Sequence, residues 1–359
     1  MTVRVNKPEF NLREKLSELE RPIGLKGSEL MRAETTQEAG TLLGVGRRNF
    51  CINGNFKCWQ RATSIASSAT GNNSNSYKYV SADRWQSYFY NTYDRQDVVL
   101  PNGEKVYALR ETMQTTRNFL VYIIENGGRT WNQGGDITIS FWARTSGSRT
   151  GVSLGYYWHD NWAGSAYTNN NERKNIIIEG SEWKHYSVTK RLNANANNRA
   201  NLAIEFDNIN YVGSWIQLTS GEWWEFANVQ IEKGKVASEF EHRSYGEELA
   251  LCQRYYARVR MNQQEWLYNE SNTASHKWHW TNVPFSMRSN PSVDVSDLST
   301  GISVSGLSGT ISSVAAQQPG DTPGRVSTRI TMSQNTGTAR YIHHFDGWSG
   351  DYMAFSSEL

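Results

Sequence analysis

The chain has 359 residues, so it is long enough for two or three domains and too long to depend on a single small core. Hydrophobic residues make up 38% of it and aromatic residues 12%, and an apolar content carried by Trp, Tyr and Phe is typical of β-rich proteins. The formal net charge is +2, without a Lys/Arg block or a run of about 18 apolar residues, which argues against a dedicated nucleic-acid binder and against membrane insertion.

Residues 1–46 differ from the rest of the chain, because they contain no Trp or Tyr and show the densest alternation of charges. Leu12, Leu16 and Leu19 are spaced to share one face of a short helix, and a second short helix is predicted at 29–43. Isolated helices below about 12–15 residues are marginal in water, so these need a partner surface. We therefore predict a docking segment that folds against a neighbouring protein or against copies of itself. A leader that is disordered in solution stays the alternative.

Residues 47–245 consist of short alternating runs separated by Gly, Asn and Ser, which predicts an antiparallel β-sandwich. The predicted strands are 85–91, 106–111, 118–124, 136–143, 152–158, 176–178, 184–192, 200–206, 215–218 and 223–232. Ile137, Ile139 and Phe141 alternate with their neighbours, so one face of that strand should be buried. Ten strands over about 185 residues match the size of one jelly roll.

Residues 246–359 are predicted to form a small antiparallel β domain that trimerises the chain or faces a receptor. The segment 247–259 is the one strongly amphipathic stretch, helical or a long strand, in which Leu251, Tyr255 and Val259 would share a helical face. The β-prone runs after it are 277–283, 292–295, 302–304, 325–332 and 338–344.

The same C-terminal unit has more aromatic side chains than a domain of its size readily buries. They are Tyr255, Tyr256, Trp266, Tyr268, Trp278 and Trp280. Aromatic residues anchor interface cores well, so we predict that some lie between subunits of a homotrimer. His276, Trp278 and Trp280 would share one strand face, and such a strip is more often core than binding platform.

The cysteines and histidines indicate no metal chemistry. Cys51, Cys58 and Cys252 form no CxxC pair, and the N-terminus lacks the apolar centre of a secretory signal. We therefore expect folding in a cytoplasm and three buried, reduced thiols. No HExxH motif occurs, and His343 and His344 would point to opposite faces of a strand. Neither a metal nor a cofactor is predicted.

The strongest candidate for ligand binding is the region around residues 156–171, where aromatic side chains stand beside Asn and Asp. Aromatic rings can stack on the apolar face of a sugar while short polar side chains bond its hydroxyls. The predicted ligand-binding residues are Tyr157, Trp158, Asp160, Asn161, Trp162 and Tyr167. Burial in the core is the competing interpretation for about half of them.

Five short blocks in sequence order resemble the tail-fibre and virion structural proteins of marine and cyanobacterial tailed phages. These blocks are 53–61 (NGNFKCWQR), 81–85 (SADRW), 137–142 (ITISFW), 229–234 (VQIEKG) and 240–256 (FEHRSYGEELALCQRYY). The leader 5–16 (VNKPEFNLREKL) is similar to the N-termini of such appendage proteins. The blocks at 53–56 and 224–232 also resemble the first and last strands of jelly-roll carbohydrate-binding modules. Some of those modules hold a structural calcium with acidic residues there, and Lys57 departs from that pattern.

This resemblance implies a non-enzymatic virion protein, produced in the host cytoplasm. It would be a tail fibre or similar appendage that attaches to phage tail or capsid proteins through residues 1–46 and binds host cell-surface polysaccharide. Linked weak sites in a trimer would gain about 10²–10⁴ in effective affinity.

Two other functions stay open, a purely architectural capsid or tail component and a glycan depolymerase. Depolymerising tailspikes usually depend on a long parallel β-helix, and this sequence has no period of about 20–30 residues. Cleavage of a glycosidic bond also needs a pair of carboxylates. The acids Glu179, Glu182, Glu222 and Glu225 are predicted to be ordinary surface residues of strands and loops.

Overall fold

The computed structural model describes residues 48–65, 78–79, 82–87, 91–114, 119–147, 149–159, 173–207, 218–260, 266–268, 276–282, 287–289, 291–294, 302–304, 307–309, 311–317, 325–332, 342–344 and 352–357. The predicted docking residues Leu12, Leu16 and Leu19 lie outside these ranges. No helix within them is both long and apolar enough to cross a bilayer.

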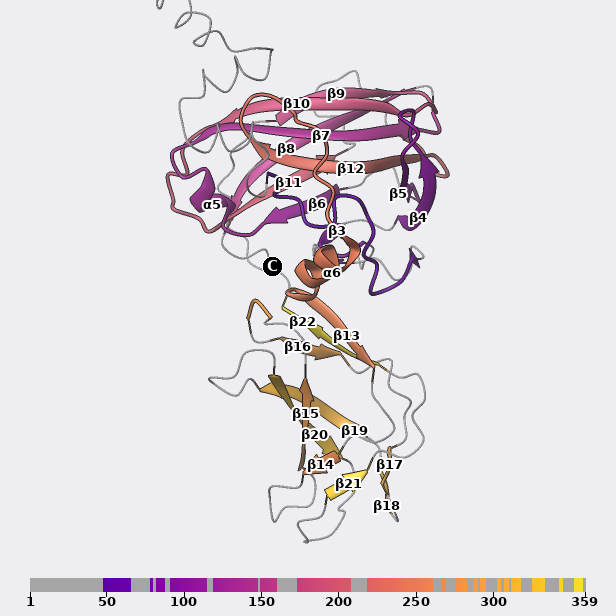
Figure 1. Cartoon of the computed structure of the whole chain (residues 1–359), viewed down its shortest axis with the longest axis vertical. Helices are drawn as coiled ribbons and strands as arrows, with labels where there is room; N and C mark the ends of the chain where they lie inside the picture. Colours follow the sequence, from indigo (N-terminus) through magenta and orange to yellow (C-terminus); the bar gives the residue numbers. More distant parts are fainter. Residues whose placement is uncertain are drawn as a thin grey trace, which may run out of the picture.

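The described part of the chain is mainly β, as predicted, and its larger unit is a sandwich of two antiparallel sheets (Figure 1). Its strands are β1 (Ser64–Ile65), β2 (Lys78–Tyr79), β3 (Trp85–Ser87), β4 (Thr92–Val99), β5 (Lys105–Thr112), β6 (Phe119–Ile124), β7 (Gly135–Thr145), β8 (Arg149–His159), β9 (Arg173–Glu179), β10 (Lys184–Leu192), β11 (Asn201–Asp207) and β12 (Trp223–Lys233). A single helical turn, α5 (Gly127–Thr130), separates β6 from β7.

Each sheet of the sandwich has six strands, and the chain passes repeatedly from one sheet to the other. The first sheet has the order β1-β4-β5-β12-β7-β10, and the second has the order β2-β3-β6-β11-β8-β9. The final strand, β12, inserts between β5 and β7 in the middle of the first sheet. This interleaving is that of a jelly roll, and it makes the sandwich depend on pairings between residues far apart in the sequence.

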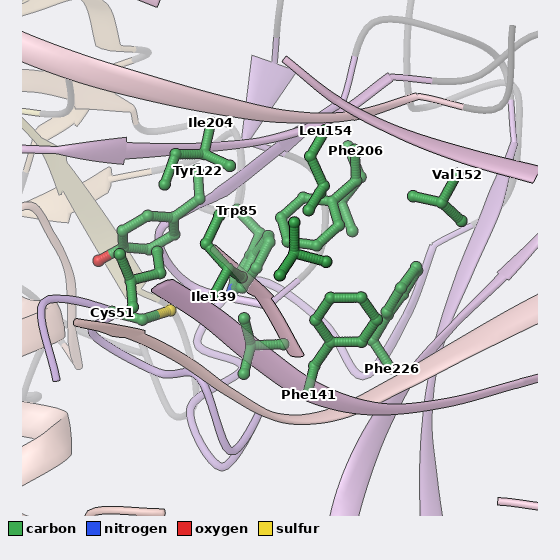
Figure 2. Close-up of a cluster of buried hydrophobic side chains, with 14 of the residues drawn as sticks. Cys51, Trp85, Tyr122, Ile139, Phe141, Val152, Leu154, Ile204, Phe206 and Phe226 are labelled. Atoms are coloured by element: carbon green, nitrogen blue, oxygen red, sulfur yellow. The ribbon is translucent and has the colours of Figure 1, made fainter. Parts of the chain in front are cut away.

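The main core lies between the two sheets and is rich in aromatic rings (Figure 2). In β7, Ile137, Ile139 and Phe141 point into this core, so the predicted alternation is confirmed. The rings of Phe141, Phe206 and Phe226 meet edge to face with centroids 5.5–5.7 Å apart. Each such aromatic pair contributes about 0.5–1.5 kcal/mol beyond the burial of its area.

Most of the predicted sandwich strands are present, some longer or shorter than expected, whereas the predicted strand at 215–218 falls mainly outside the described residues. The prediction missed β4, which pairs with β5 over eight residues. The sequence of β4, TYDRQDVV, alternates poorly because only Tyr93 is buried in the core. Its pairing with β5 decides its conformation.

The interpretation of 247–259 as a single helix or strand is wrong. The helix α6 covers Tyr245–Gln253, and a strand, β13 (Tyr256–Arg260), follows almost at once. The side chain of Ser244 caps α6 by accepting a hydrogen bond from the backbone N–H of Glu247. The expected helical face of Leu251, Tyr255 and Val259 therefore does not form, because the last two residues lie beyond the helix.

The described residues after α6 form three small antiparallel sheets, with orders β13-β22-β16, β19-β20-β15-β14-β21 and β17-β18. Their remaining strands are β14 (Trp266–Tyr268), β15 (His276–Asn282), β16 (Ser292–Asp294), β17 (Ile302–Val304), β18 (Leu307–Gly309), β19 (Ile311–Gln317), β20 (Arg325–Met332), β21 (Ile342–His344) and β22 (Tyr352–Ser356). The side chains of the predicted strip on β15 lie outside the described part of the structure. The domain boundaries at 46 and 245, and the trimer, stay predictions.

Candidate functional site

The predicted ligand residues Tyr157 and Trp158 lie next to each other on β8 and therefore point to opposite faces of the second sheet. Trp158 is 4% exposed and belongs to the core between the sheets, so its ring is not presented as a sugar platform. Tyr157 lies on the outer face, where it packs with Val121, Ile123 and Ala203. The other predicted ligand residues, Asp160, Asn161, Trp162 and Tyr167, lie outside the described residues.

On the outer face of the second sheet, Arg173 hydrogen-bonds Tyr157 and two acidic side chains. Arg173 donates to a carboxylate oxygen of Glu205 and of Asp207, both at 2.8 Å, and also to the hydroxyl of Tyr157. Gly155 makes room for this arrangement, because a Cβ there would lie 2.8 Å from the Tyr157 ring. Two carboxylates and a phenol are thus held in fixed positions around one guanidinium.

The outer face of the first sheet carries a cluster that the sequence did not predict. Glu225 on the central strand β12 pairs directly with Arg110 of β5 on one side and with Arg144 of β7 on the other. The Nε of Arg110 donates to Oε1 of Glu225 at 2.6 Å, and the Nε of Arg144 donates to Oε2 at 2.5 Å. The side chain of Glu225 is 0% exposed, whereas those of Arg110 and Arg144 are 28% and 25% exposed.

Tryptophan rings fix the planes of these two guanidinium groups. The guanidinium carbon of Arg110 lies 4.4 Å from the ring centroid of Trp223. That of Arg144 lies 4.7 Å from Trp183 and 5.6 Å from Trp223. Such cation–π contacts contribute about 0.5–2 kcal/mol each and restrict the side chains to one geometry. We call Arg110, Arg144, Trp183, Trp223 and Glu225 the arginine–tryptophan face.

The same surface continues across the first sheet through Trp142. Its indole makes an edge-to-face contact with the imidazole of His185, with centroids 5.3 Å apart, in register between β7 and β10. Partial burial lowers the pKa of His185, so its imidazole is favoured in the neutral form. Trp142 and Trp183 pack with the small, buried residues Ala108 and Ala227 of the same sheet. The surface therefore combines flat rings and hydrogen-bond donors.

The prediction that Glu225 is an ordinary surface acid is wrong, because two arginines cover it. Burying a carboxylate costs several kcal/mol, and an ion pair recovers only part of this cost. Apolar residues of similar size in the same positions often stabilise a fold equally well. A buried acid on the outer face of a sheet is thus poorly explained by stability alone. The alternation of β12 places Glu225 outward, but only the register of β5 and β7 brings Arg110 and Arg144 to it.

The five sequence blocks that resemble phage appendage proteins do not form the arginine–tryptophan face. Asn53 has a positive φ of 59°, and its side-chain amide bonds the backbone of Cys58 and of Asp83. Gly54 lies against β12, where a Cβ would approach the carbonyl oxygen of Val229 to 2.0 Å. Blocks 53–61, 81–85 and 229–234 therefore meet at one end of the sandwich.

The block 240–256 binds to that same end and forms a connector between the sandwich and β13. The Nη1 of the buried Arg243 donates to the carbonyl of Cys51 at 3.1 Å and to Glu248 of α6 at 3.2 Å. The guanidinium carbons of Arg84 and Arg61 lie 3.5 Å and 3.6 Å from the ring centroids of Tyr255 and Tyr256. These blocks thus stabilise the attachment of α6, and ligand binding is not needed to explain them.

The three cysteines are free and buried, as predicted. Burial raises the pKa of the Cys51 and Cys252 thiols well above the usual value, so both favour the unreactive protonated form. Within the described ranges, no group of three or more His, Cys, Asp or Glu side chains is arranged to hold a metal ion.

No protein-family model and no curated protein sequence matches this chain. The sandwich is similar to a CBM4 domain, with 13% identity and a TM-score of 0.30 over 51% of this chain and all of that one. It is also similar to the CBM22-2 xylan-binding domain of Paenibacillus barcinonensis Xyn10C, with 12% identity and a TM-score of 0.31 over 48% of this chain and 98% of that one.

A third similar structure is the enzymatically active domain of tailspike protein 4 from bacteriophage CBA120. The identity is 13% and the TM-score 0.31, and the match covers 52% of this chain and only 21% of the tailspike chain. At such values, the three likenesses concern the layout of the sandwich alone.

Proposed function

We propose that this chain is a non-enzymatic appendage protein of a tailed-phage virion, which binds host-surface glycan through the arginine–tryptophan face. The five ordered sequence blocks and the leader support the assignment to phage appendages. In this proposal, residues 1–46 attach the chain to tail or capsid proteins of the particle, and the sandwich faces the host.

The observation that carries glycan binding is the side-by-side presentation of rings and donors on one sheet face. Trp142 and Trp223 are partly exposed, and sugars stack their apolar faces on such rings. Arg110 and Arg144 use one edge to hold Glu225 and keep a quarter of their side chains exposed. Guanidinium N–H groups can bond sugar hydroxyls and ring oxygens. Stacking and ion pairing hold these groups in position before a ligand arrives, which lowers the entropic cost of binding.

The test is binding of the fluorescently labelled full-length chain to host cells and to an array of host envelope glycans. We expect Trp223→Ala to weaken binding at least about tenfold, equivalent to about 1.4 kcal/mol. Tyr245→Ala is the matched control, because Tyr245 is a well-exposed aromatic residue on α6, away from the face. Binding that is unchanged by Trp223→Ala but lost in Trp162→Ala would place the site in the region around residues 156–171 that the sequence predicted.

Three further measurements address the rest of the proposal. A chain lacking residues 1–46 should fold and bind glycan but not join particles. Sedimentation of the full chain should give a trimer, in which linked weak sites gain effective affinity. Release of reducing ends from host envelope material would contradict the non-enzymatic assignment. Normal incorporation of a chain that binds no glycan and no cells would instead favour the architectural role.

A further inference from the structure

Resting on the proposed function, we infer that the arginine–tryptophan face selects glycans that carry carboxylate groups, such as uronic acid polymers. The reason lies in which charged groups the face presents to solvent. Glu225 is fully buried beneath the arginines, whereas about a quarter of each arginine side chain is exposed. A ligand that approaches the face therefore meets cationic groups first.

The hydrogen-bonding capacity of the two arginines is only partly used. Arg110 directs Nε and Nη2 at Oε1 of Glu225, and Arg144 directs Nε at Oε2. A guanidinium has five N–H donors in a planar fork, and within the described part of the chain these two groups bond no other acceptor. Their remaining N–H groups are free to bind a second carboxylate on the exposed side, where a planar, bidentate contact is the favoured geometry.

The neighbouring charges reduce this preference at Arg110 and leave it at Arg144. Asp94 is next in register to Arg110 on β4, and its carboxylate keeps its negative charge while it accepts a hydrogen bond from Ser64. It lies one strand from Arg110 but three strands from Arg144, which corresponds to about 14 Å at normal strand spacing. On the other side, Lys184 pairs with Glu179, and His185 favours its neutral form. The cationic part of the surface is thus centred on Arg144 and extends over Glu225 toward Arg110.

The stacked tryptophans add shape to this charge preference. The ring of Trp223 lies near both guanidinium groups, and that of Trp183 lies near the guanidinium of Arg144. An acidic sugar could place its carboxylate between the arginines and its ring near Trp223 or Trp142. A neutral sugar would gain only the ring contact and hydrogen bonds to uncharged hydroxyls, which are weaker than charge-assisted ones.

The experiment compares polygalacturonate with its fully methyl-esterified form, which has the same backbone without the charge. Binding of the full-length chain to each is measured by titration calorimetry at low and at physiological salt. We expect polygalacturonate to bind at least tenfold more tightly than the ester, with a difference that shrinks as salt rises. Equal affinity for the two polymers would overturn the inference.

Two substitutions separate a role in ligand selection from a role in folding. Arg144→Gln removes one cation and should bring the acid-to-ester affinity ratio close to one. Glu225→Gln keeps the size and an acceptor but removes the buried negative charge, so it should raise that ratio several-fold. A merely structural cluster would lower both affinities together in both variants, and this outcome would also overturn the inference.

The outcomes also distinguish the inference from the proposed function. Tight binding of both polymers that depends on Trp223 would leave glycan binding intact and remove only the preference for acids. Binding of neither polymer, with no labelling of host cells and no hit on the glycan array, would remove the proposed function itself.

Discussion

The buried ion pair between Arg243 and Glu248 should determine whether the connector stays attached to the sandwich. Arg243 also donates to the backbone carbonyls of Asn49 and Cys51, and Glu248 accepts the backbone N–H of Asn53. One substitution, Arg243→Met, removes the charge that compensates Glu248 and leaves two carbonyls without this donor. We expect the connector to loosen and the protein to lose stability.

The magnitude follows from the burial of both partners. Removing one partner of a buried ion pair costs about 3–5 kcal/mol, because an uncompensated charge remains in a medium of low dielectric constant. Glu248→Gln alone should cost less, about 1–3 kcal/mol, because Glu241, 3.9 Å from Arg243, still compensates part of its charge and the new amide oxygen can accept the N–H of Asn53. The double variant Arg243→Met/Glu248→Gln contains no buried charge, so it should be about 1–3 kcal/mol more stable than the sum of the two single changes predicts.

Urea unfolding of the full chain, followed by tryptophan fluorescence, measures these differences at constant m-value. The control is Glu247→Gln, one residue before Glu248 on the exposed side of α6, which should stay within about 0.5 kcal/mol of wild type. A loss below about 1 kcal/mol for Arg243→Met, or strict additivity in the double variant, would refute the reasoning that this pair is energetically important.

Three further predictions concern single positions. Gly54→Ala should destabilise by about 1–3 kcal/mol or more in thermal melts, because the new Cβ would lie 2.0 Å from the carbonyl oxygen of Val229. The pKa of His185 is lowered in the fold, so as the pH falls the unfolded chain takes up a proton at this residue before the folded chain does, near pH 6.5. The melting temperature should therefore fall as the pH drops below that value. The variant His185→Gln should remove this dependence. Cys252→Ser should be less stable than Cys252→Ala by about 1–3 kcal/mol in urea unfolding, because it buries a hydroxyl beside only a weak thiol partner.

Much of the fold could be predicted because its strands carry a local signal. Strand β10 has the predicted bounds, and β7 and β12 extend their predicted ranges by one or two residues at an end. Side chains that alternate between core and surface identify such strands without knowledge of their partners. Strand β4 could not be identified in this way, because most of its side chains are polar and its pairing with β5 is what orders it.

The candidate site was predicted less well than the fold. The sequence placed aromatic residues near 156–167 on a ligand surface, but Trp158 is part of the core. Trp223 and Glu225 are two positions apart on the predicted strand 223–232, so the sequence does indicate that they share one face of it. Nothing local indicated that Glu225 would be buried, since the side chains that cover it come from positions 110 and 144.

The amino-acid sequence by itself determined the β-rich class, the alternation of buried positions in strands such as β7, and the buried state of the three cysteines. These properties depend on residue type and on a period of two residues, which are local. The tertiary structure alone decided the register of β5, β7 and β12, and with it the contact between Glu225, Arg110 and Arg144. Register depends on the simultaneous packing of both sheets, and shifting one strand by a single residue would turn its outward side chains into the core.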